Sequence, residues 1–220
     1  MIVDSFLFFQ ELDLLEIRLK YLYPIVDKFI IVEACQTFRG SYKAYNFEKN
    51  INRYRKYLNK ISYHKIEDKH LNYERLIFFL ENSKLKTHKK IKNFLESHNF
   101  YNKNNLSHVL DSYHRECIHI ALDKTCDSND IILISDLDEI PGYEAIKDIS
   151  NKKIDDLMVF IQHEFQYFLN NYSNSNWSGS IIAPYKILKN NSLNDIRINS
   201  QNLPIISRSG YHFTSIGNKK

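Results

Sequence analysis

A run of branched apolar residues that ends in three acids constrains the fold of this chain more than any other segment. Residues 131–141 read IILISDLDEIP, in which the acids are Asp136, Asp138 and Glu139. Such a run is typical of a strand that is buried on both faces of a sheet, and Pro141 prevents that strand from continuing. Because ligands bind at the carboxyl ends of strands in open α/β sheets, the acids are expected at a ligand-binding edge.

Three crowded carboxylates repel one another unless a cation lies between them. Hard divalent ions such as Mg2+ and Mn2+ prefer oxygen ligands and commonly bridge a protein carboxylate to a substrate phosphate. The segment therefore predicts a site for a metal and a diphosphate. The alternatives are a solvated turn and a helix N-terminus, where acids are also favourable. A phosphatase of the haloacid type is disfavoured, because that family has Gly-Thr after its second Asp, where this chain has Glu139-Ile140.

Composition and charge limit the class of protein. With 220 residues, 43% of them hydrophobic and 14% aromatic, the chain can bury the core of one α/β domain. A net charge of +4, from 30 basic and 26 acidic residues, is too mild to predict nucleic-acid binding. Three cysteines without paired spacing predict neither a zinc site nor a disulfide framework, and they fit a reducing compartment. Because the sequence has no apolar run long enough to span a membrane and no signal peptide, we expect a cytoplasmic protein.

Strand and helix patterns alternate along the first part of the chain. Strands are predicted at 2–9, 25–34, 60–66 and 130–136, and helices at 12–23, 73–98 and 106–123. This alternation predicts an α/β fold with a mostly parallel central sheet and helices on both faces. After Ser150, aromatic residues occur in shorter segments broken by Asn and Ser, which indicates an antiparallel half. We predict a single domain over residues 1–220, divided into halves at 1–141 and 142–220.

Four segments of the chain form a specific set. They are residues 4–6 running into 11–19, residues 26–34 continuing to Thr37, Gly40 and Lys43, residues 135–141, and residues 210–213. Together these segments resemble glycosyltransferase family 17, the family of the bisecting N-acetylglucosaminyltransferases. Two departures occur: Tyr211 stands where the family usually has Trp, and family members continue past this last motif with a helical stretch. We therefore expect part of the active-site wall to be missing from this sequence.

The resemblance implies a GT-A-like nucleotide-sugar-binding fold, with a metal at an Asp-x-Asp motif. It implies transfer of a sugar, N-acetylglucosamine in the best-known members, from a UDP-sugar to a glycan hydroxyl with inversion. The expected cofactor is Mn2+ or Mg2+, and the expected partners are the donor and a glycan acceptor. Residues 1–141 would be the nucleotide-sugar-binding half and 142–220 the acceptor-side half. Two alternatives stay open: a metal-dependent phosphatase or nucleotidyltransferase, and a non-catalytic glycan-binding protein with the same fold.

The resemblance gives the side chains of the acidic motif expected roles. Asp138 is expected to bind the metal directly, and Asp136 to bind the metal or the donor ribose. A fixed cation suits this reaction, because it stabilises the charge that develops on a diphosphate leaving group. Glu139 is expected to orient the loop or to support the metal ligands, and a direct role at the metal is the alternative. His212 is expected to complete the metal site, the alternative being a packed, hydrogen-bonded histidine.

Donor binding is expected to involve four residues of the first half. Glu33 ends a buried-type strand and by resemblance would bind the uridine or ribose, unless it caps a backbone amide or lies exposed at the sheet edge. Thr37 belongs to the loop that follows this strand. Lys43 and Arg115 are candidate cations for the diphosphate, which an Arg fork can bind through two hydrogen bonds. Either residue can equally form a surface ion pair.

The candidates for acceptor binding and for the catalytic base come mainly from the second half. Trp177 and Tyr167, with Tyr172 nearby, are expected to stack on an acceptor sugar, although the only Trp of a chain is often part of its core. An inverting reaction needs a base at the acceptor hydroxyl. Glu164 is the candidate, since it lies within the aromatic segment, and Glu11 in the first half is an alternative.

Overall fold

The computed structural model describes residues 1–150, 152, 154–168, 170–207 and 209–214. In these residues the strands form one nine-stranded sheet. In chain order they are β1 (Ile2–Leu7), β2 (Lys28–Ala34), β3 (Ile61–Ile66), β4 (Ile131–Asp136), β5 (Glu139–Pro141), β6 (Met158–Gln166), β7 (Tyr172–Pro184), β8 (Ile205–Ile206) and β9 (Gly210–Thr214).

The helices follow the strands in alternation through the first half of the chain. In chain order they are α1 (Leu12–Leu22), α2 (Asn46–Lys49), the 3-10 helix η1 (Ile51–Lys60), α3 (Tyr73–Asn82), α4 (Lys86–Ser97), α5 (Leu106–Glu116), α6 (Ile118–Thr125), α7 (Tyr143–Ser150), α8 (Tyr185–Leu188), α9 (Leu193–Ile198) and the 3-10 helix η2 (Ser200–Asn202). Among the described residues, no helix has both the length and the apolar content needed to cross a bilayer.

The strand order across the sheet is β3-β2-β1-β4-β7-β6-β9-β5, with β8 beside β6. The four strands β3, β2, β1 and β4 are parallel to their neighbours. The long strand β7 then runs antiparallel to both β4 and β6, and β5 runs antiparallel to β9, while β8 and β9 are parallel to β6. The predicted α/β fold is confirmed: the sheet is mostly parallel and its antiparallel pairs involve the second half.

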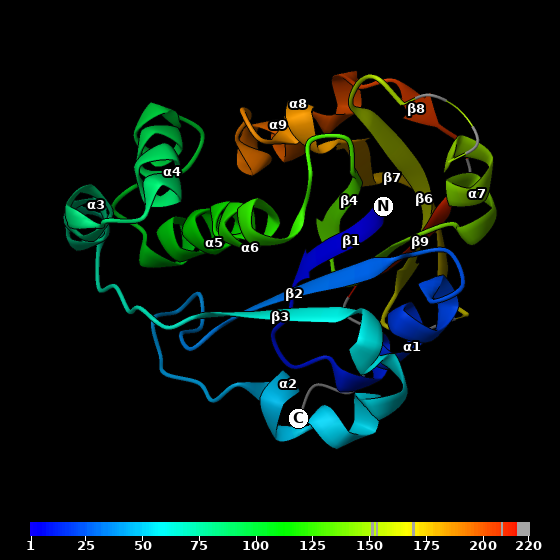
Figure 1. The fold of residues 1–220 in the computed structure, drawn as a ribbon, viewed down its shortest axis with the longest axis horizontal. Helices are drawn as coiled ribbons and strands as arrows, with labels where there is room; N and C mark the ends of the chain where they lie inside the picture. Colours follow the sequence, from blue (N-terminus) through cyan, green and yellow to red (C-terminus); the bar gives the residue numbers. More distant parts are fainter. Residues whose placement is uncertain (151, 153, 169, 208, 215–220) are drawn as a thin grey trace.

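Two apolar cores cover the two faces of this sheet, because successive strand residues point to opposite sides. On β2, Ile30 and Val32 face the core that α3, α4, α5, α6, α8 and α9 cover, whereas Phe29 and Ile31 face the core under α1, α2, η1 and α7. Figure 1 shows these helix groups on either side of the sheet. A strand that is covered on both faces requires a continuous apolar run, whereas a strand with one exposed face alternates between apolar and polar residues.

Two of the predicted helices are wrong as continuous elements. The predicted helix 73–98 is divided into α3 and α4, because Ser83 has an extended backbone (φ −74°, ψ 141°). The Ser83 hydroxyl accepts a hydrogen bond from the backbone N–H of Leu85 at 3.2 Å. Such local side-chain bonds compete with helical bonds and favour helix ends. The predicted helix 106–123 likewise consists of α5 and α6, which meet at Cys117.

The acidic segment also differs from its simplest prediction. The strand β4 ends at Asp136, before Pro141 is reached, and the chain turns through Leu137 and Asp138 into the separate strand β5. Pro141 is the last residue of β5 and pairs with Gly210 of β9. Proline has no backbone N–H group and therefore cannot donate a hydrogen bond to a neighbouring strand. Because β5 lies at the edge of the sheet, this does not interrupt the hydrogen bonds between interior strands. Residues 136–139, which are the end of β4, the turn and the start of β5, are called the acidic loop below.

Candidate functional site

The acidic loop lies at the edge of the sheet where the parallel strands end. The carboxyl ends of β1, β2, β3 and β4 share this edge, because these strands are parallel and in register. The loop is fixed to the second half of the chain by β9, since the backbone N–H of Phe213 donates to the carbonyl of Asp138 at 2.9 Å. Glu139 is also paired with His212 across β5 and β9. Strand pairing therefore places the acidic motif next to a histidine that lies 73 positions further along the chain.

Glu139 points inward and is fully buried. Its Oε1 accepts hydrogen bonds from Trp177 Nε1 at 2.7 Å and from Arg197 Nη2 at 2.8 Å. Its Oε2 accepts from Arg197 Nη1 at 3.0 Å and from the backbone N–H of Asp136 at 3.0 Å. With four donors on its two oxygens, Glu139 connects the acidic loop to β7 and α9.

Asp136 lies between two arginines. Arg115 Nη1 is 2.7 Å from Asp136 Oδ1, and Arg197 Nη2 is 2.7 Å from Asp136 Oδ2. Burial by itself would raise the pKa of Asp136, but the charges of Arg115 and Arg197 outweigh it and hold that pKa well below its usual range. Asp136 is therefore a carboxylate at any working pH, and both of its oxygens are engaged by guanidinium groups.

Asp138, like Asp136, has a partly exposed side chain. About a third of its side chain is exposed (32%), and its Oδ2 is 3.5 Å from His212 Nε2. The His212 ring stacks on Trp177, with ring centroids 4.5 Å apart and an interplanar angle of 24°. Burial lowers the pKa of His212, but the bond and charge of Asp138 outweigh this effect, so the net pKa is raised. The other ring nitrogen of His212, Nδ1, is buried without a hydrogen-bond partner among the described residues.

Glu164 lies on the same side of the sheet as His212, because the two residues are directly opposite each other on β6 and β9. The Ser175 hydroxyl donates a hydrogen bond to Glu164 Oε2, and this bond lowers the pKa of Glu164. The structure thus brings the predicted base and the predicted histidine to adjacent positions. Nothing in this arrangement requires Glu11, which lies at the start of α1 and accepts a hydrogen bond from the backbone N–H of Gln10 at 2.9 Å.

The predicted acceptor aromatics occupy two different environments. Trp177 is engaged by Glu139 and His212, as described above. Tyr167 is 54% exposed at the turn between β6 and β7, and its φ of 64° places it in the left-handed region. Tyr172 is 45% exposed, and its hydroxyl lies 3.2 Å from His163 Nδ1. Only Trp177 of these three contacts residues of the acidic loop in the described part of the chain.

Glu33, at the predicted nucleoside end, is fully buried and makes four hydrogen bonds within the protein. Its carboxylate accepts from Lys43 Nζ at 2.5 Å, Tyr63 Oη at 2.9 Å, and the backbone N–H groups of Asn46 and Phe47 at 2.6 and 3.1 Å. The two backbone groups open α2, so Glu33 caps this helix. The backbone-capping alternative is thus present, and the predicted contact with uridine or ribose stays a prediction.

Thr37 lies in the loop between β2 and α2, where its hydroxyl accepts a hydrogen bond from the backbone N–H of Ser41 at 3.2 Å. Gly40 in the same loop has a φ of 87°, and a Cβ at this position would approach Leu106 to 2.7 Å. The loop is therefore shaped by a conformation and a close contact that favour glycine. Thr37 and Lys43 lie at the carboxyl end of β2, and β1 separates β2 from β4, the strand that leads into the acidic loop.

Arg197 is the functional candidate that the sequence did not reveal. It belongs to the short helix α9, and its guanidinium contacts Asp136 and Glu139 together. A lone arginine in a segment of Asn and Ile carries no sequence signal for this role, and only the docking of α9 brings it to the loop. Glu116 holds the start of α9, because it is fully buried and accepts hydrogen bonds from the backbone N–H groups of Leu193 and Asn194.

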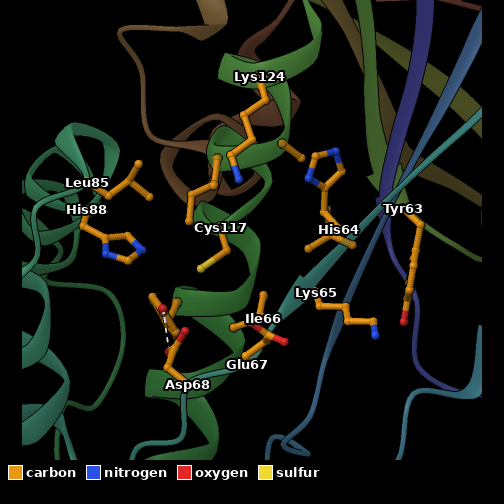
Figure 2. A pocket seen from close by; sticks show the side chains of 14 residues that line it. Tyr63, His64, Lys65, Ile66, Glu67, Asp68, Leu85, His88, Cys117 and Lys124 are labelled. Atoms are coloured by element: carbon orange, nitrogen blue, oxygen red, sulfur yellow. Dashed lines mark hydrogen bonds between the residues drawn. The ribbon is translucent and has the colours of Figure 1, made fainter. Parts of the chain in front are cut away.

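A cavity of about 480 Å³ lies along β3. Residues 63–68 line it, and the side chains of His88, Cys117 and Lys124 point into it from the neighbouring helices (Figure 2). The strands β2 and β1 lie between β3 and β4, and none of the lining residues belongs to the acidic loop. The candidate site is therefore assigned by the carboxylates and their partners, and this cavity is a separate feature.

The sequence model of glycosyltransferase family 17 matches residues 1–106 of this chain. A search of curated proteins finds no significant match. Among solved structures, the chain is similar to a protein from Bacillus anthracis described as a glucose-1-phosphate thymidylyltransferase in complex with a sucrose, with 9% identity over 95% of this chain and 87% of that chain and a TM-score of 0.44. It is also similar to HddC from Yersinia pseudotuberculosis, with 8% identity over 98% of this chain and 89% of that chain and a TM-score of 0.42.

The family match covers two of the four segments that carry the resemblance, namely residues 4–19 and 26–43. The acidic loop and the segment around His212 lie outside the matched residues. The family match therefore agrees with the resemblance inferred from the sequence over residues 1–106, just under half of the 220-residue chain.

Proposed function

We propose that this protein is a metal-dependent, inverting glycosyltransferase that moves a hexosyl or N-acetylhexosaminyl group from a UDP-sugar to a glycan hydroxyl. One observation supports it most strongly. Asp138, His212 and Glu164 come from three different segments and meet on one side of the sheet, beside an acidic loop that already carries two arginines. An acid proposed to bind the metal, a proposed base and two cations for a diphosphate therefore lie close together.

The side chains at this site could supply some, but not all, of the ligands of a single divalent ion. In the described part of the chain, no three His, Cys, Asp or Glu side chains gather closely enough to hold a metal by themselves. Asp138 is accessible and has His212 beside it, so these two residues would hold Mn2+ or Mg2+, with donor oxygens and water completing the shell. The bound ion would supply Lewis-acid stabilisation to the diphosphate. Asp136, whose oxygens are taken by arginines, supports the site through Arg115 and Arg197 instead.

The two arginines have a direct part in this proposal. Arg115 and Arg197 approach Asp136 from two different helices, and Arg197 is additionally fixed by Glu139. Guanidinium groups fixed in this way are suited to the charge that develops on a departing diphosphate, because they need no reorganisation during the reaction. Glu33, Thr37 and Lys43 lie at the end of β2, where the proposed nucleoside would bind.

Glu164 is the proposed catalytic base. It would take the proton from the acceptor hydroxyl while the hydroxyl oxygen bonds to the anomeric carbon of the donor sugar. The bond from that carbon to the diphosphate oxygen breaks at the same time, and UDP leaves with the electron pair. Tyr167 and Tyr172, exposed near the turn of the β6–β7 hairpin, would contact the acceptor glycan, and Trp177 would border the same space while orienting Glu139.

The test is a thermal-shift titration with UDP in the presence and absence of Mn2+. We expect UDP to raise the melting temperature only with Mn2+, and Asp138→Ala to abolish the shift without loss of folding. Asp148→Ala, an exposed acid on α7, is the matched control and should keep the shift. A folded protein that gives no shift contradicts the donor assignment. Phosphate release from model esters without any acceptor would support a phosphatase, and donor binding without transfer to any acceptor would support a glycan-binding protein.

A further inference from the structure

Arg18 is a fully buried arginine in α1 that no role described so far uses. Its partner is Asp4 of β1, which is also fully buried: Arg18 Nε is 2.8 Å from Asp4 Oδ2, and Arg18 Nη2 is 2.6 Å from Asp4 Oδ1. This fork neutralises the charge of the guanidinium. The face of Phe6 lies 4.4 Å from the guanidinium carbon and closes one side of the site.

The remaining donors of Arg18 are directed to the acidic loop. Its Nη1 lies 2.8 Å from the carbonyl oxygen of Asp136, 3.1 Å from that of Leu137 and 3.0 Å from that of Glu139. Its Nη2 also donates to the hydroxyl of Ser135 at 2.5 Å. The guanidinium therefore contacts β1, the end of β4 and three of the four loop carbonyls at once.

These contacts determine which way the loop faces. Three carbonyl groups converge on one buried cation, so the backbone of the loop curves around Arg18. The side chain of Asp138, whose carbonyl is the one that Arg18 does not bind, remains accessible beside His212. Neutralising a buried arginine requires only Asp4, and burying an ion pair seldom stabilises a protein more than apolar residues of the same size. The carbonyl contacts are thus best explained by the geometry that they give to the loop.

We propose that Arg18 is the positioning residue of the metal site: its guanidinium fixes the loop backbone so that Asp138 and His212 present their ligand atoms together. This inference rests on the proposed function, because it concerns the same metal. Arg18 itself touches neither the metal nor the substrate. Residues that orient metal ligands typically change metal affinity by about 10–100-fold when they are substituted.

The experiment compares Arg18→Lys with the unaltered protein and with Arg53→Lys. Lysine keeps the charge near Asp4, but a single ammonium group cannot reach Asp4, Ser135 and three carbonyls together. Arg53 is the matched control, because it also contacts the region of α1, through Asp13 and Glu16, but from the exposed surface. The measurements are the Kd for Mn2+ in the presence of UDP, by electron paramagnetic resonance, and the fluorescence emission of Trp177, the only Trp in the chain.

We expect Arg18→Lys to raise the Kd for Mn2+ by about 10–100-fold. We also expect its Trp177 emission to move to longer wavelength without metal, because Glu139, the partner of the Trp177 N–H group, belongs to the same loop. Arg53→Lys should change neither quantity. A folded Arg18→Lys variant with an unchanged Kd and unchanged emission overturns the role of Arg18. An unaltered protein that binds no Mn2+ with UDP overturns the proposed function, and the inference with it.

Ser135→Ala settles the case in which Arg18→Lys does not fold. It removes only the hydroxyl that Arg18 Nη2 contacts and leaves the Asp4 pair in place. A smaller rise of the Kd for Mn2+, in the same direction and with the folded state retained, supports the proposal. A normal Kd and normal Trp177 emission in Ser135→Ala, together with an unfolded Arg18→Lys, show that Arg18 acts on overall stability alone and overturn it.

Discussion

Arg197 and Glu139 form a two-pronged ion pair, with Nη1–Oε2 and Nη2–Oε1 distances of 3.0 and 2.8 Å. Glu139 is fully buried, whereas a quarter of the Arg197 side chain is exposed (25%). The pair joins α9 to the acidic loop, and the same arginine also reaches Asp136. This single side chain therefore fixes the position of two of the three motif acids.

Removing Arg197 should destabilise the protein. We expect Arg197→Met to lower the free energy of unfolding by about 3 kcal/mol, because it leaves the buried charge of Glu139 without its arginine. Urea unfolding monitored by circular dichroism measures this. Arg53→Met, which breaks an exposed ion pair, should cost no more than about 1 kcal/mol. Equal losses in the two variants would contradict a special role for the Arg197–Glu139 pair.

Glu33 should prove important for stability whatever its role in donor binding. We expect Glu33→Gln to lower the free energy of unfolding by about 2–4 kcal/mol, since the carboxylate accepts four hydrogen bonds in a fully buried position. Thermal and urea unfolding measure the loss. Glu48→Gln, which breaks the partly exposed pair between Glu48 and Lys65, is the control and should have a small effect. A stable Glu33→Gln variant that merely loses UDP affinity would show that Glu33 serves the donor alone.

Stability should depend on pH through His114. Burial lowers the pKa of His114 from 6.5 to about 4, and its Nε2 has no hydrogen-bond partner among the described residues. The unfolded chain binds the proton more readily, so His114 leaves stability intact above pH 6.5 and reduces it as the pH falls towards about 4. The loss at the lower end of this range amounts to about 3 kcal/mol.

The variant His114→Leu tests this pH dependence. The free energy of unfolding of the unaltered protein should fall relative to that of His114→Leu between neutral pH and about pH 4, as measured by urea unfolding at several pH values. The control is His108→Leu, at an exposed position of the same helix, which should retain the pH dependence of the unaltered protein. Parallel pH profiles for His114→Leu and the unaltered protein would be the contrary result.

Glu164 and Glu11 give different predictions for turnover. We expect Glu164→Gln to lower kcat by about 10²–10⁴-fold with the UDP-dependent thermal shift unchanged, because a base acts on the acceptor and not on the donor. Glu11→Gln should keep full turnover. The readout is UDP release during transfer to an acceptor, once a donor screen has identified the active sugar nucleotide. If Glu11→Gln lost turnover and Glu164→Gln did not, the catalytic base would be Glu11, in the first half of the chain.

Much of the fold follows from patterns within short stretches of sequence. Pro24 follows the end of the first helix, apolar runs mark β2 and β4, and the three acids mark the place where β4 ends. These features could be predicted because each depends on residues close together in the chain, whose spacing decides local conformation and burial. The end of α3 at Ser83 was not predicted. The Ser83 hydroxyl competes with helical hydrogen bonds by accepting one from the backbone N–H of Leu85, and such a contact leaves the spacing of apolar residues unchanged.

The sequence by itself thus determined that three acids gather where a strand of an α/β sheet ends. Only the tertiary structure decided that Glu139 turns inward, that Asp136 pairs with two arginines and that Asp138 stays accessible beside His212. Arg197 is 58 residues from Glu139, and Arg18 is 118 residues from Asp136. Contacts over such separations depend on sheet register and helix docking, which arise from the packing of the whole core and leave no periodic signal in the chain.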